Sequence, residues 1–200
     1  MKRPALVILF LTIISFCSAQ EPDGFHAGVF GGLVASQVDG DNYAGYNRLG
    51  FQFGGFTNFK LTQDWGAQIE IKYLQKGSKE ASQKNVYYFA IKLDYVEIPF
   101  LVNYQFDEKM YAEGGLSFAY LLGAHEDRDG YGYSDATGDF EAYDASALLG
   151  FNYIFNAHFI GNVKYSYSIL PIRPHPGNQT YWGDMGSYNN LLSAALYYKF

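Results

Sequence analysis

Apolar and polar side chains alternate along most of the chain, which is the pattern of β-strands with two different faces. In the last thirteen residues, 188–200, one face carries Leu192, Ala194, Leu196, Tyr198 and Phe200. The terminal residues of domains are usually polar and frayed, so an apolar final strand is unusual. We expect this strand to pair with another strand and its apolar face to be covered by a protein core or by lipid.

The same alternation predicts eight strands, joined by connections that are in turn long and short. The short connections fall near 60–64, 106–109 and 156–157, and the long ones are polar. An even number of antiparallel strands with short turns at one end and long loops at the other is typical of outer-membrane proteins. The sequence therefore predicts an all-β fold, an eight-stranded antiparallel up-and-down transmembrane β-barrel. Its expected strands are 25–35, 48–59, 65–75, 87–105, 110–122, 140–155, 158–169 and 188–200.

The fourth of these strands contains a change in pattern. Apolar residues occupy odd positions from Phe89 to Tyr95 and even positions from Ile98 to Tyr104. A slip of one residue exchanges the two faces of a strand, so we expect a β-bulge between Tyr95 and Pro99. Proline cannot donate a hydrogen bond to the ladder and suits such a defect.

A soluble, lipocalin-like barrel is the alternative to a membrane barrel, and it would show a charged face to water. Here one face of each strand is almost free of charge, whereas a lysine facing lipid at mid-height would cost roughly 2–4 kcal/mol. The opposite face carries charges of both signs. We therefore expect lipid outside the barrel and ion pairs inside it, with these candidates for lumenal pairs: Glu70, Lys72, Lys92, Asp94, Glu97, Glu113 and Lys164.

Composition agrees with a sheet that meets a membrane interface. Aromatic residues make up 19% of the chain and charged residues only 17%, against about 25% in soluble domains. Many aromatics fall near the predicted strand ends, where they form girdles in membrane barrels. The alternative is that aromatic residues simply favour strands. The candidates for the girdles are Trp65, Phe106, Phe155, Phe159 and Phe200 at the turn end and Tyr73, Tyr120 and Tyr167 at the loop end.

The first nineteen residues have the three parts of a signal peptide, namely a basic start, an apolar stretch over 5–16 and a small-residue cleavage site at 17–19. We expect a signal peptide over 1–19 and an outer-membrane β-barrel domain over 20–200. Cys17 could instead accept a lipid, but bulky Phe16 before it fits a lipoprotein signal badly. The cleaved chain would lack cysteine and carry 12 basic against 20 acidic residues, a net charge of −8, which argues against nucleic acid as a partner.

Catalytic and metal-binding patterns are weak. The four histidines, at 26, 125, 158 and 175, make no recognisable motif with serine and an acid, although residues distant in sequence can meet in a fold. A Gly-containing loop with Asp127, Asp129 and Asp135 faintly resembles a calcium loop, but it lacks the spacing and terminal glutamate of an EF-hand. A solvated acidic loop is the favoured interpretation, and we expect no cofactor.

Several segments are similar to one known family. They are Gly-Val-Phe-Gly-Gly-Leu-Val-Ala-Ser at 28–36, Tyr-Leu-Gln-Lys-Gly at 73–77, Leu-Asp-Tyr-Val-Glu-Ile-Pro-Phe-Leu at 93–101, Gly-Gly at 114–115 and Tyr-Lys-Phe at 198–200. With these, the chain resembles the PorT-like outer-membrane β-barrel family of Bacteroidota. The resemblance implies an eight-stranded barrel inserted by the barrel-assembly machinery, which would read Leu196, Tyr198 and Phe200. The family member that gives the name is linked to protein secretion across the outer membrane.

These observations predict an outer-membrane protein with a structural or interaction role in the cell envelope. It would anchor, bind partners through its outer loops or assist protein secretion. Its expected partners are outer-membrane lipid, the barrel-assembly machinery and proteins of an envelope or secretion complex. A small pore or transport-related barrel is the main alternative, and an outer-membrane enzyme is a further one.

Overall fold

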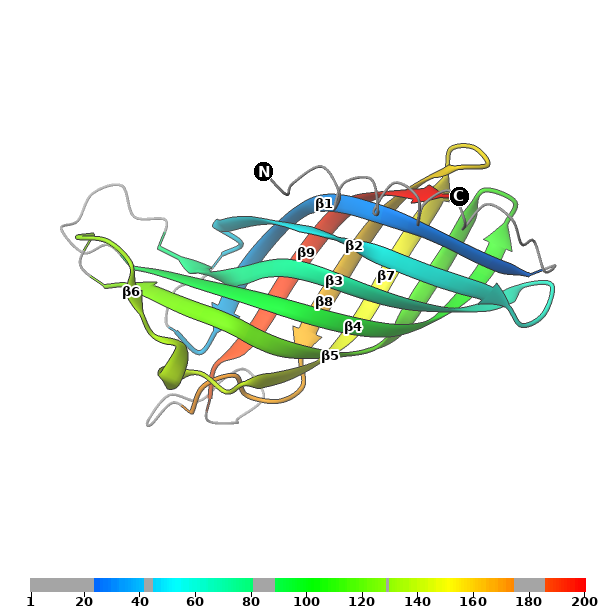
Figure 1. Ribbon diagram of the computed structural model, residues 1–200. Coiled ribbons are helices and arrows are strands. Elements are labelled where there is room, and N and C mark those ends of the chain that lie inside the picture. Colours follow the sequence, from blue (N-terminus) through cyan, green and yellow to red (C-terminus); the bar gives the residue numbers. More distant parts are fainter. Residues whose placement is uncertain (1–23, 42–44, 81–88, 129, 175–185) are drawn as a thin grey trace, which may run out of the picture.

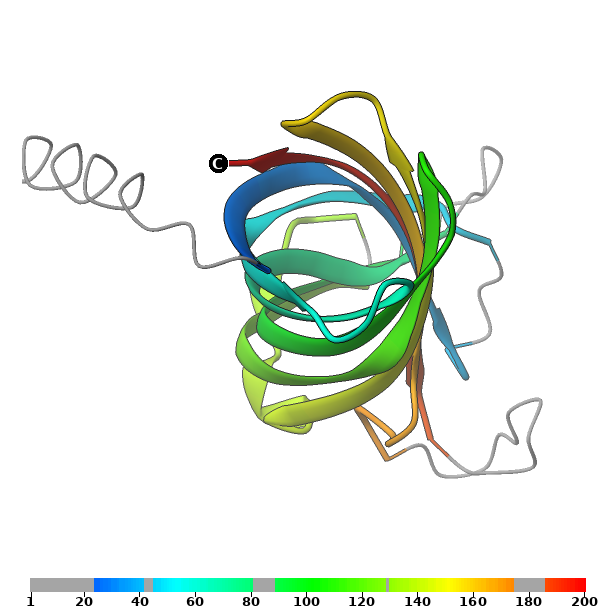
Figure 2. The ribbon, with the colours of Figure 1, turned by 90° about the vertical axis from the view of Figure 1, so that its right-hand side faces the viewer.

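Eight antiparallel strands close into a barrel in the computed structural model, which describes residues 24–41, 45–80, 89–128, 130–174 and 186–200. Viewed from one end, the strands form a ring (Figure 2). A two-residue strand, β6 (Ser134–Asp135), and a 3-10 turn, η2 (Thr137–Asp139), lie in the connection between β5 and β7. The barrel strands are β1 (Phe25–Asp39), β2 (Arg48–Lys60), β3 (Trp65–Lys79), β4 (Ala90–Asp107), β5 (Met110–Asp127), β7 (Tyr143–Ile154), β8 (Phe159–Ser168) and β9 (Tyr188–Lys199).

Each barrel strand pairs with its neighbours in the chain, and the last strand closes the ring against the first. The β1–β9 ladder runs from Gly28 opposite Lys199 to Asp39 opposite Tyr188. Strand β9 also pairs with β8 from Tyr198 to Asn190. The expected fold is therefore confirmed. Within the described residues, no helix has both the length and the apolar character needed to cross a membrane.

The connections alternate as the sequence predicts. Short turns join β2 to β3, β4 to β5 and β7 to β8 at one end of the barrel, and the long connections leave from the other end (Figure 1). The turn between β7 and β8 is locally determined, because the Asn156 side chain accepts hydrogen bonds from the backbone N–H groups of His158 and Phe159 at 2.9 and 3.0 Å. We call the two ends the turn end and the loop end.

The outer face of the barrel is apolar. Leu33, Leu49 and Leu149 are each about 70% exposed there, which a protein in water would avoid in such numbers but hydrocarbon covers without penalty. Aromatic residues line the turn end, where the rings of Trp65 and Tyr104 lie 4.8 Å apart. At the loop end, the rings of Tyr120 and Tyr143 pair edge to face. The outer face thus has the apolar band and aromatic ends of a transmembrane barrel.

Strand β4 differs from the prediction, because its two faces do not exchange. Ile91, Leu93 and Tyr95 point inward and are at most 1% exposed, and Glu97 continues the same inward face. The predicted bulge between Tyr95 and Pro99 is wrong. A register shift against β5 lies just before it, between Asp94 and Tyr95, while the pairing of β4 with β3 keeps one register throughout.

The extra residue at that shift belongs to β5. Asp94 pairs with Gly123 and Tyr95 with Leu121, so that Leu122 is left unmatched. A bulge on β5 increases the local twist without changing which face of β4 looks inward.

The apolar residues of the first half of β4 point inward because water, and not lipid, surrounds the barrel at the level of these residues. Toward the loop end, β3, β4 and β5 extend beyond the other strands as a projecting sheet that carries β6 (Figure 1). Their outer face there is polar: the Asp94 carboxylate accepts hydrogen bonds from the Tyr73 hydroxyl at 2.6 Å and from the Gln75 amide at 3.1 Å. Their inner face is apolar. Strand β4 therefore keeps one inward-outward alternation along its whole length. Water rather than lipid covers the outer face of the projecting sheet.

The inward apolar side chains of this region form what we call the outer apolar cluster. Its members come from β1, β3, β4, β5, β9 and the long connections, so the cluster fills the loop end of the barrel. They are Val34, Val38, Leu74, Ile91, Leu93, Tyr95, Ala119, Leu121, Ala124, Ala136, Phe140, Ile172 and Leu191.

The height of the water boundary on β4 can be tested by spin labelling in phospholipid vesicles. In a chain without Cys17, a nitroxide at Lys92→Cys should collide mainly with a water-soluble nickel reagent, and one at Ile98→Cys mainly with oxygen, because only the latter faces hydrocarbon. A label at Leu93→Cys, which points inward, should meet neither reagent readily. Preferential collision with oxygen at position 92 would contradict this boundary.

Candidate functional site

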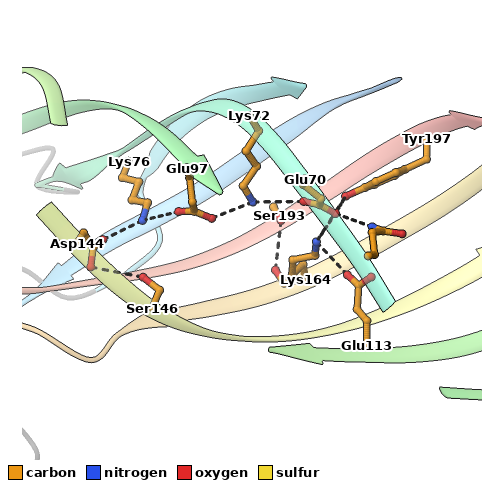
Figure 3. Close-up of polar contacts among 11 residues, drawn as sticks. Glu70, Lys72, Lys76, Glu97, Glu113, Asp144, Ser146, Lys164, Ser193 and Tyr197 are labelled. Atoms are coloured by element: carbon orange, nitrogen blue, oxygen red, sulfur yellow. Dashed lines mark hydrogen bonds and ion pairs between the residues drawn. The ribbon is translucent and has the colours of Figure 1, made fainter. Parts of the chain in front are cut away.

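The middle of the lumen holds seven ionisable side chains that come from five strands. All of them occupy inward positions of the alternation, and none is more than 4% exposed. They form the lumenal network shown in Figure 3: Glu70, Lys72 and Lys76 from β3, Glu97 from β4, Glu113 from β5, Asp144 from β7 and Lys164 from β8.

One half of the network is centred on Lys164. Its ammonium lies 3.0 Å from Glu70 Oε1 and 3.0 Å from Glu113 Oε1. The Tyr197 hydroxyl donates to Glu70 at 2.8 Å, and the Asn162 amide donates to Glu113 at 2.9 Å. One cation thus pairs with two carboxylates, and each carboxylate also accepts a hydrogen bond from a neutral donor.

The other half is centred on Lys76. Its ammonium lies 2.9 Å from Asp144 Oδ2 and 3.0 Å from Glu97 Oε2. Lys72 joins the halves, because its ammonium is 3.1 Å from Glu97 and 4.0 Å from Glu70. The result is one continuous chain of opposite charges across the barrel (Figure 3).

Two side chains shape the space around these ions. The Lys76 ammonium lies 5.0 Å from the centre of the Tyr95 ring, which adds a cation–π contact. Gly150 faces Glu113, and a Cβ at this position would come 2.5 Å from Glu113 Oε1. The glycine therefore makes room for the carboxylate.

An inner apolar cluster closes the lumen between the network and the turn end. The Phe30 and Tyr197 rings stack with centres 4.4 Å apart, and Phe56 meets Tyr197 edge to face. Ile160 is buried with them, and Tyr111, Ile154 and Ala195 pack against the group. The order along the strands places the network between the two apolar clusters: on β8, Ile160 precedes Lys164, and on β3, Glu70 and Lys72 precede Leu74.

This arrangement fills the lumen. Burying an ion costs several kcal/mol, which the attraction of close partners offsets only when all members are present. Three lysines face four carboxylates across the lumen, with contacts of 2.9–4.0 Å between them. An eight-stranded barrel has an interior that side chains can just fill.

The structure brings together five of the seven predicted lumenal residues, and the remaining two lie elsewhere. Lys92 and Asp94 are on the outer face of the projecting sheet, where Lys92 is opposite His125 on β5. Their assignment to the lumen is wrong, because it rested on the exchange of faces in β4. The other five are Glu70, Lys72, Glu97, Glu113 and Lys164.

Two members of the network were missed by the sequence reasoning. The sequence pattern ends the third strand at residue 75 and so predicts a loop at Lys76, whereas β3 continues to Lys79. The alternation itself indicates that Lys76 belongs to the lumenal face, since positions 70, 72 and 76 share one face of the strand. Asp144 alternates with Tyr143 and Ala145 in the same way, near the start of β7.

A second set of ions lies among the long connections. Glu126 accepts from Arg128 at 2.7 Å and from Arg173 at 3.3 Å, and the Arg173 guanidinium lies 5.0 Å from the centre of the Phe140 ring. The Ile172 carbonyl accepts a backbone hydrogen bond from Glu141. These contacts hold the β5–β7 and β8–β9 connections together over the outer apolar cluster.

In the described part of the acidic loop, backbone and hydroxyl groups contact the two carboxylates that were candidates for a calcium site. The Asp127 carboxylate accepts from the backbone N–H of Gly130 at 2.8 Å. Hydrogen bonds from the hydroxyl and backbone N–H of Thr137 lower the pKa of Asp135. Asp129 lies outside the described residues, and across the rest of the described chain no three potential ligands are grouped to hold a metal ion.

The histidines are spread over both ends of the barrel. His158 Nδ1 lies 3.0 Å from the carbonyl oxygen of Lys199 at the turn end, and His125 is opposite Asp135 at the loop end. His26 is at the start of β1, and His175 lies outside the described residues. The distance between the two ends prevents His125 and His158 from acting on one substrate.

The predicted assembly signal lies on the outer face. Leu196, Tyr198 and Phe200 are 39–48% exposed, and the Tyr198 ring contacts the rings of Phe159 and Phe200. They would meet lipid at the turn end. Their reading by an assembly machine stays a prediction.

The stability of the lumen should depend more on Lys164 than on Lys72. Lys164→Met removes the cation shared by Glu70 and Glu113, and we expect a loss of about 3–5 kcal/mol in the free energy of unfolding. Lys72→Met should cost less, because Glu97 keeps Lys76 and Glu70 keeps Lys164. Urea titration of the folded protein in phospholipid vesicles measures both, with Lys109→Met in an exposed turn as the control. Equal losses of unfolding free energy for the two lumenal variants would contradict the larger role given to Lys164.

Comparison with known proteins agrees with the fold. A model of the outer membrane protein beta-barrel domain matches residues 18–173. No curated protein matches the sequence. Among solved structures, Neisserial surface protein A (NspA) is similar with 12% identity and a TM-score of 0.55, over 90% of this chain and all of that one. The attachment invasion locus protein Ail of Yersinia pestis is similar with 14% identity and a TM-score of 0.52, over 88% of this chain and 99% of that one. A structure of Ail with the heparin analogue sucrose octasulfate has a TM-score of 0.51, with 13% identity over 88% of this chain and 99% of Ail. The chain belongs to the outer membrane protein beta-barrel domain family.

Proposed function

We propose that this protein is a closed outer-membrane barrel with a structural or interaction role, and that it acts through its loop end. The observation that carries the proposal is the filled lumen. Ion pairs block its middle, and an apolar cluster lies on either side of them. A solute would have to separate buried charges to pass, which is energetically expensive. The rigid barrel is then a support for the surface that it carries.

That surface includes an exposed segment before β6. The side chain of Tyr131 is 97% exposed and that of Tyr133 is 46% exposed. Gly130 and Gly132 have φ angles of 77° and 120°, a conformation that glycine adopts without strain. Tyrosines among glycines and serines are typical of loops that bind proteins, because tyrosine offers a large contact area with little loss of entropy. Pairing of β6 with β5 fixes the segment to the projecting sheet.

The charge of this segment favours some partners over others. Residues 126–141 contain six acidic residues and one basic residue. Ail has been seen with a polyanion, the heparin analogue, but an acidic surface would repel such a ligand. We therefore propose a protein partner with a neutral or basic surface.

The route to the membrane is part of the same proposal. A cleaved signal peptide at 1–19, which lies outside the described residues, would export the chain. The barrel-assembly machinery would then insert it by way of its terminal aromatic strand. Similarity to PorT-like barrels of Bacteroidota supports a partner in an envelope or secretion complex. The pattern of histidines and acids supports no enzymatic role.

The closed lumen predicts an absence of channel activity. Purified protein in planar bilayers should show no stepwise current at voltages where a general porin, added as the positive control, conducts. The reason is the continuous packing of ions and apolar side chains across the barrel. Reproducible openings by the wild-type protein would contradict the proposal and favour the small pore.

The loop-end surface predicts site-dependent crosslinking in the native envelope. A photo-reactive amino acid at Tyr131 or Tyr133 should give one discrete protein adduct, because these side chains project from the barrel. The same group at lipid-facing Leu149 or at Lys109 in a turn should not give that adduct. Equal adducts from all four positions, or none from 131 and 133, would argue against a partner at this surface.

A further inference from the structure

A cavity of about 230 Å³ opens at the turn end of the barrel, on the far side of the inner apolar cluster from the lumenal network. Tyr111, Ile154 and Ile160 form its floor, and all three belong to or pack against that cluster. The turn between β2 and β3 borders its mouth, at the end of the barrel that faces the viewer in Figure 2. We call it the turn-end cavity.

The rim of the cavity is polar and carries positive charge. Lys60 ends β2 and Lys199 ends β9, and within the described part of the chain neither forms an ion pair. His26 adds a third nitrogen base, and Asp64 is the one carboxylate side chain among the lining residues. Two cations against one anion favour an anionic ligand.

A half-buried asparagine side chain also faces this space. The side-chain oxygen of Asn103 is shielded from solvent and has no hydrogen-bond partner within the described residues. A buried polar atom without a partner is uncommon in folded proteins and costs about 1–3 kcal/mol. An amide can present either its oxygen or its NH₂ group. Asn103 can therefore meet the polar head of a ligand in either protonation state.

The mouth of the cavity reaches the edge of the membrane. Phe59 and Trp65 line the cavity, and both belong to the face of β2 and β3 that carries the lipid-facing residues. Phe59 stacks on Phe25 with ring centres 5.5 Å apart, as part of the aromatic rim. A ligand with an apolar tail could thus pass between the bilayer interface and the apolar floor.

From this geometry we propose that the turn-end cavity binds the carboxylate of a medium-chain fatty acid. The tail would lie on Tyr111, Ile154 and Ile160, and the carboxylate would face Lys60 and Lys199. At about 30 Å³ for each small group, the volume holds seven or eight carbons, which suits a chain of eight to ten carbons with its head at the rim. The site is independent of the proposed loop-end function, since it lies at the opposite end of the barrel.

The fluorescence of Trp65 provides a direct test. In a Trp182→Phe background folded in lipid nanodiscs, 10-bromodecanoate should quench Trp65 in a saturable manner, and unbrominated decanoate should reverse the quenching. Decyltrimethylammonium, with the same tail and the opposite charge, should not compete. Saturation and reversal would show a site rather than partition into lipid.

Matched variants locate the site. The double variant Lys60→Gln and Lys199→Gln should weaken the saturable binding at least tenfold, and Asn103→Phe, which fills the cavity, should abolish it. Lys109→Gln, in the β4–β5 turn at the same end, should bind as the parent does, because Lys109 does not line the cavity. Heat-dependent migration in gels verifies that each variant is folded.

The proposal is overturned if quenching rises linearly without saturation, if the cationic amphiphile competes as well as decanoate, or if folded Lys60→Gln, Lys199→Gln and Asn103→Phe variants bind as the parent does. None of these outcomes bears on the crosslinking at Tyr131, so failure here leaves the proposed function separately testable.

Discussion

The height at which hydrocarbon gives way to water along β3, β4 and β5 determines the organisation of the barrel. Below that height, lipid covers the outer side chains, and charged groups are confined to the lumen. Above it, water covers the outer side chains, and the lumen becomes an apolar core as in a soluble barrel. Glu97 and Leu93 point to the same interior from one strand, four residues apart. The inward face of β4 is therefore continuous in space but changes from apolar to charged along the strand.

The charges in the lumen also fix the register of the strands. A slip of one residue on β3 would turn Glu70 and Lys72 toward lipid, and would bring Ile69 and Ile71 inside. Lysine at the bilayer midplane costs roughly 2–4 kcal/mol, and the carboxylates left behind would lose their partners. A buried ion pair adds little stability relative to apolar packing, yet it makes the alternative pairings costly. We infer that the network contributes more to the choice of this strand register than to the stability of the barrel.

Much of this structure could be predicted from the sequence, because period-two alternation and turn spacing report directly on strands. The closure of β9 on β1, the three short turns and five members of the lumenal network all follow from that alternation.

Lys92 and Asp94 were misplaced for a physical reason: an apolar residue on one face does not say whether lipid or a core covers it. Tyr95 is a core residue and Ile98 a lipid-facing one, and only the depth of each in the membrane distinguishes them. Lys76 and Asp144 were missed because strand ends depend on contacts with neighbouring strands. The turn-end cavity is lined by residues from all eight barrel strands, so no local sequence pattern predicts it.

A filled lumen separates the two ends of the barrel. At the loop end, the Glu126–Arg173 pair and Ile172 tie two connections over the outer apolar cluster, so that the projecting sheet has a fixed base. At the turn end, the inner apolar cluster forms the floor of a cavity with a basic rim. Because both clusters pack against the same ionic layer, neither end can collapse into the lumen. A barrel that conducts would have to leave this interior open and would lose both supports. The side chains that close the lumen are thus the ones that give each end its shape.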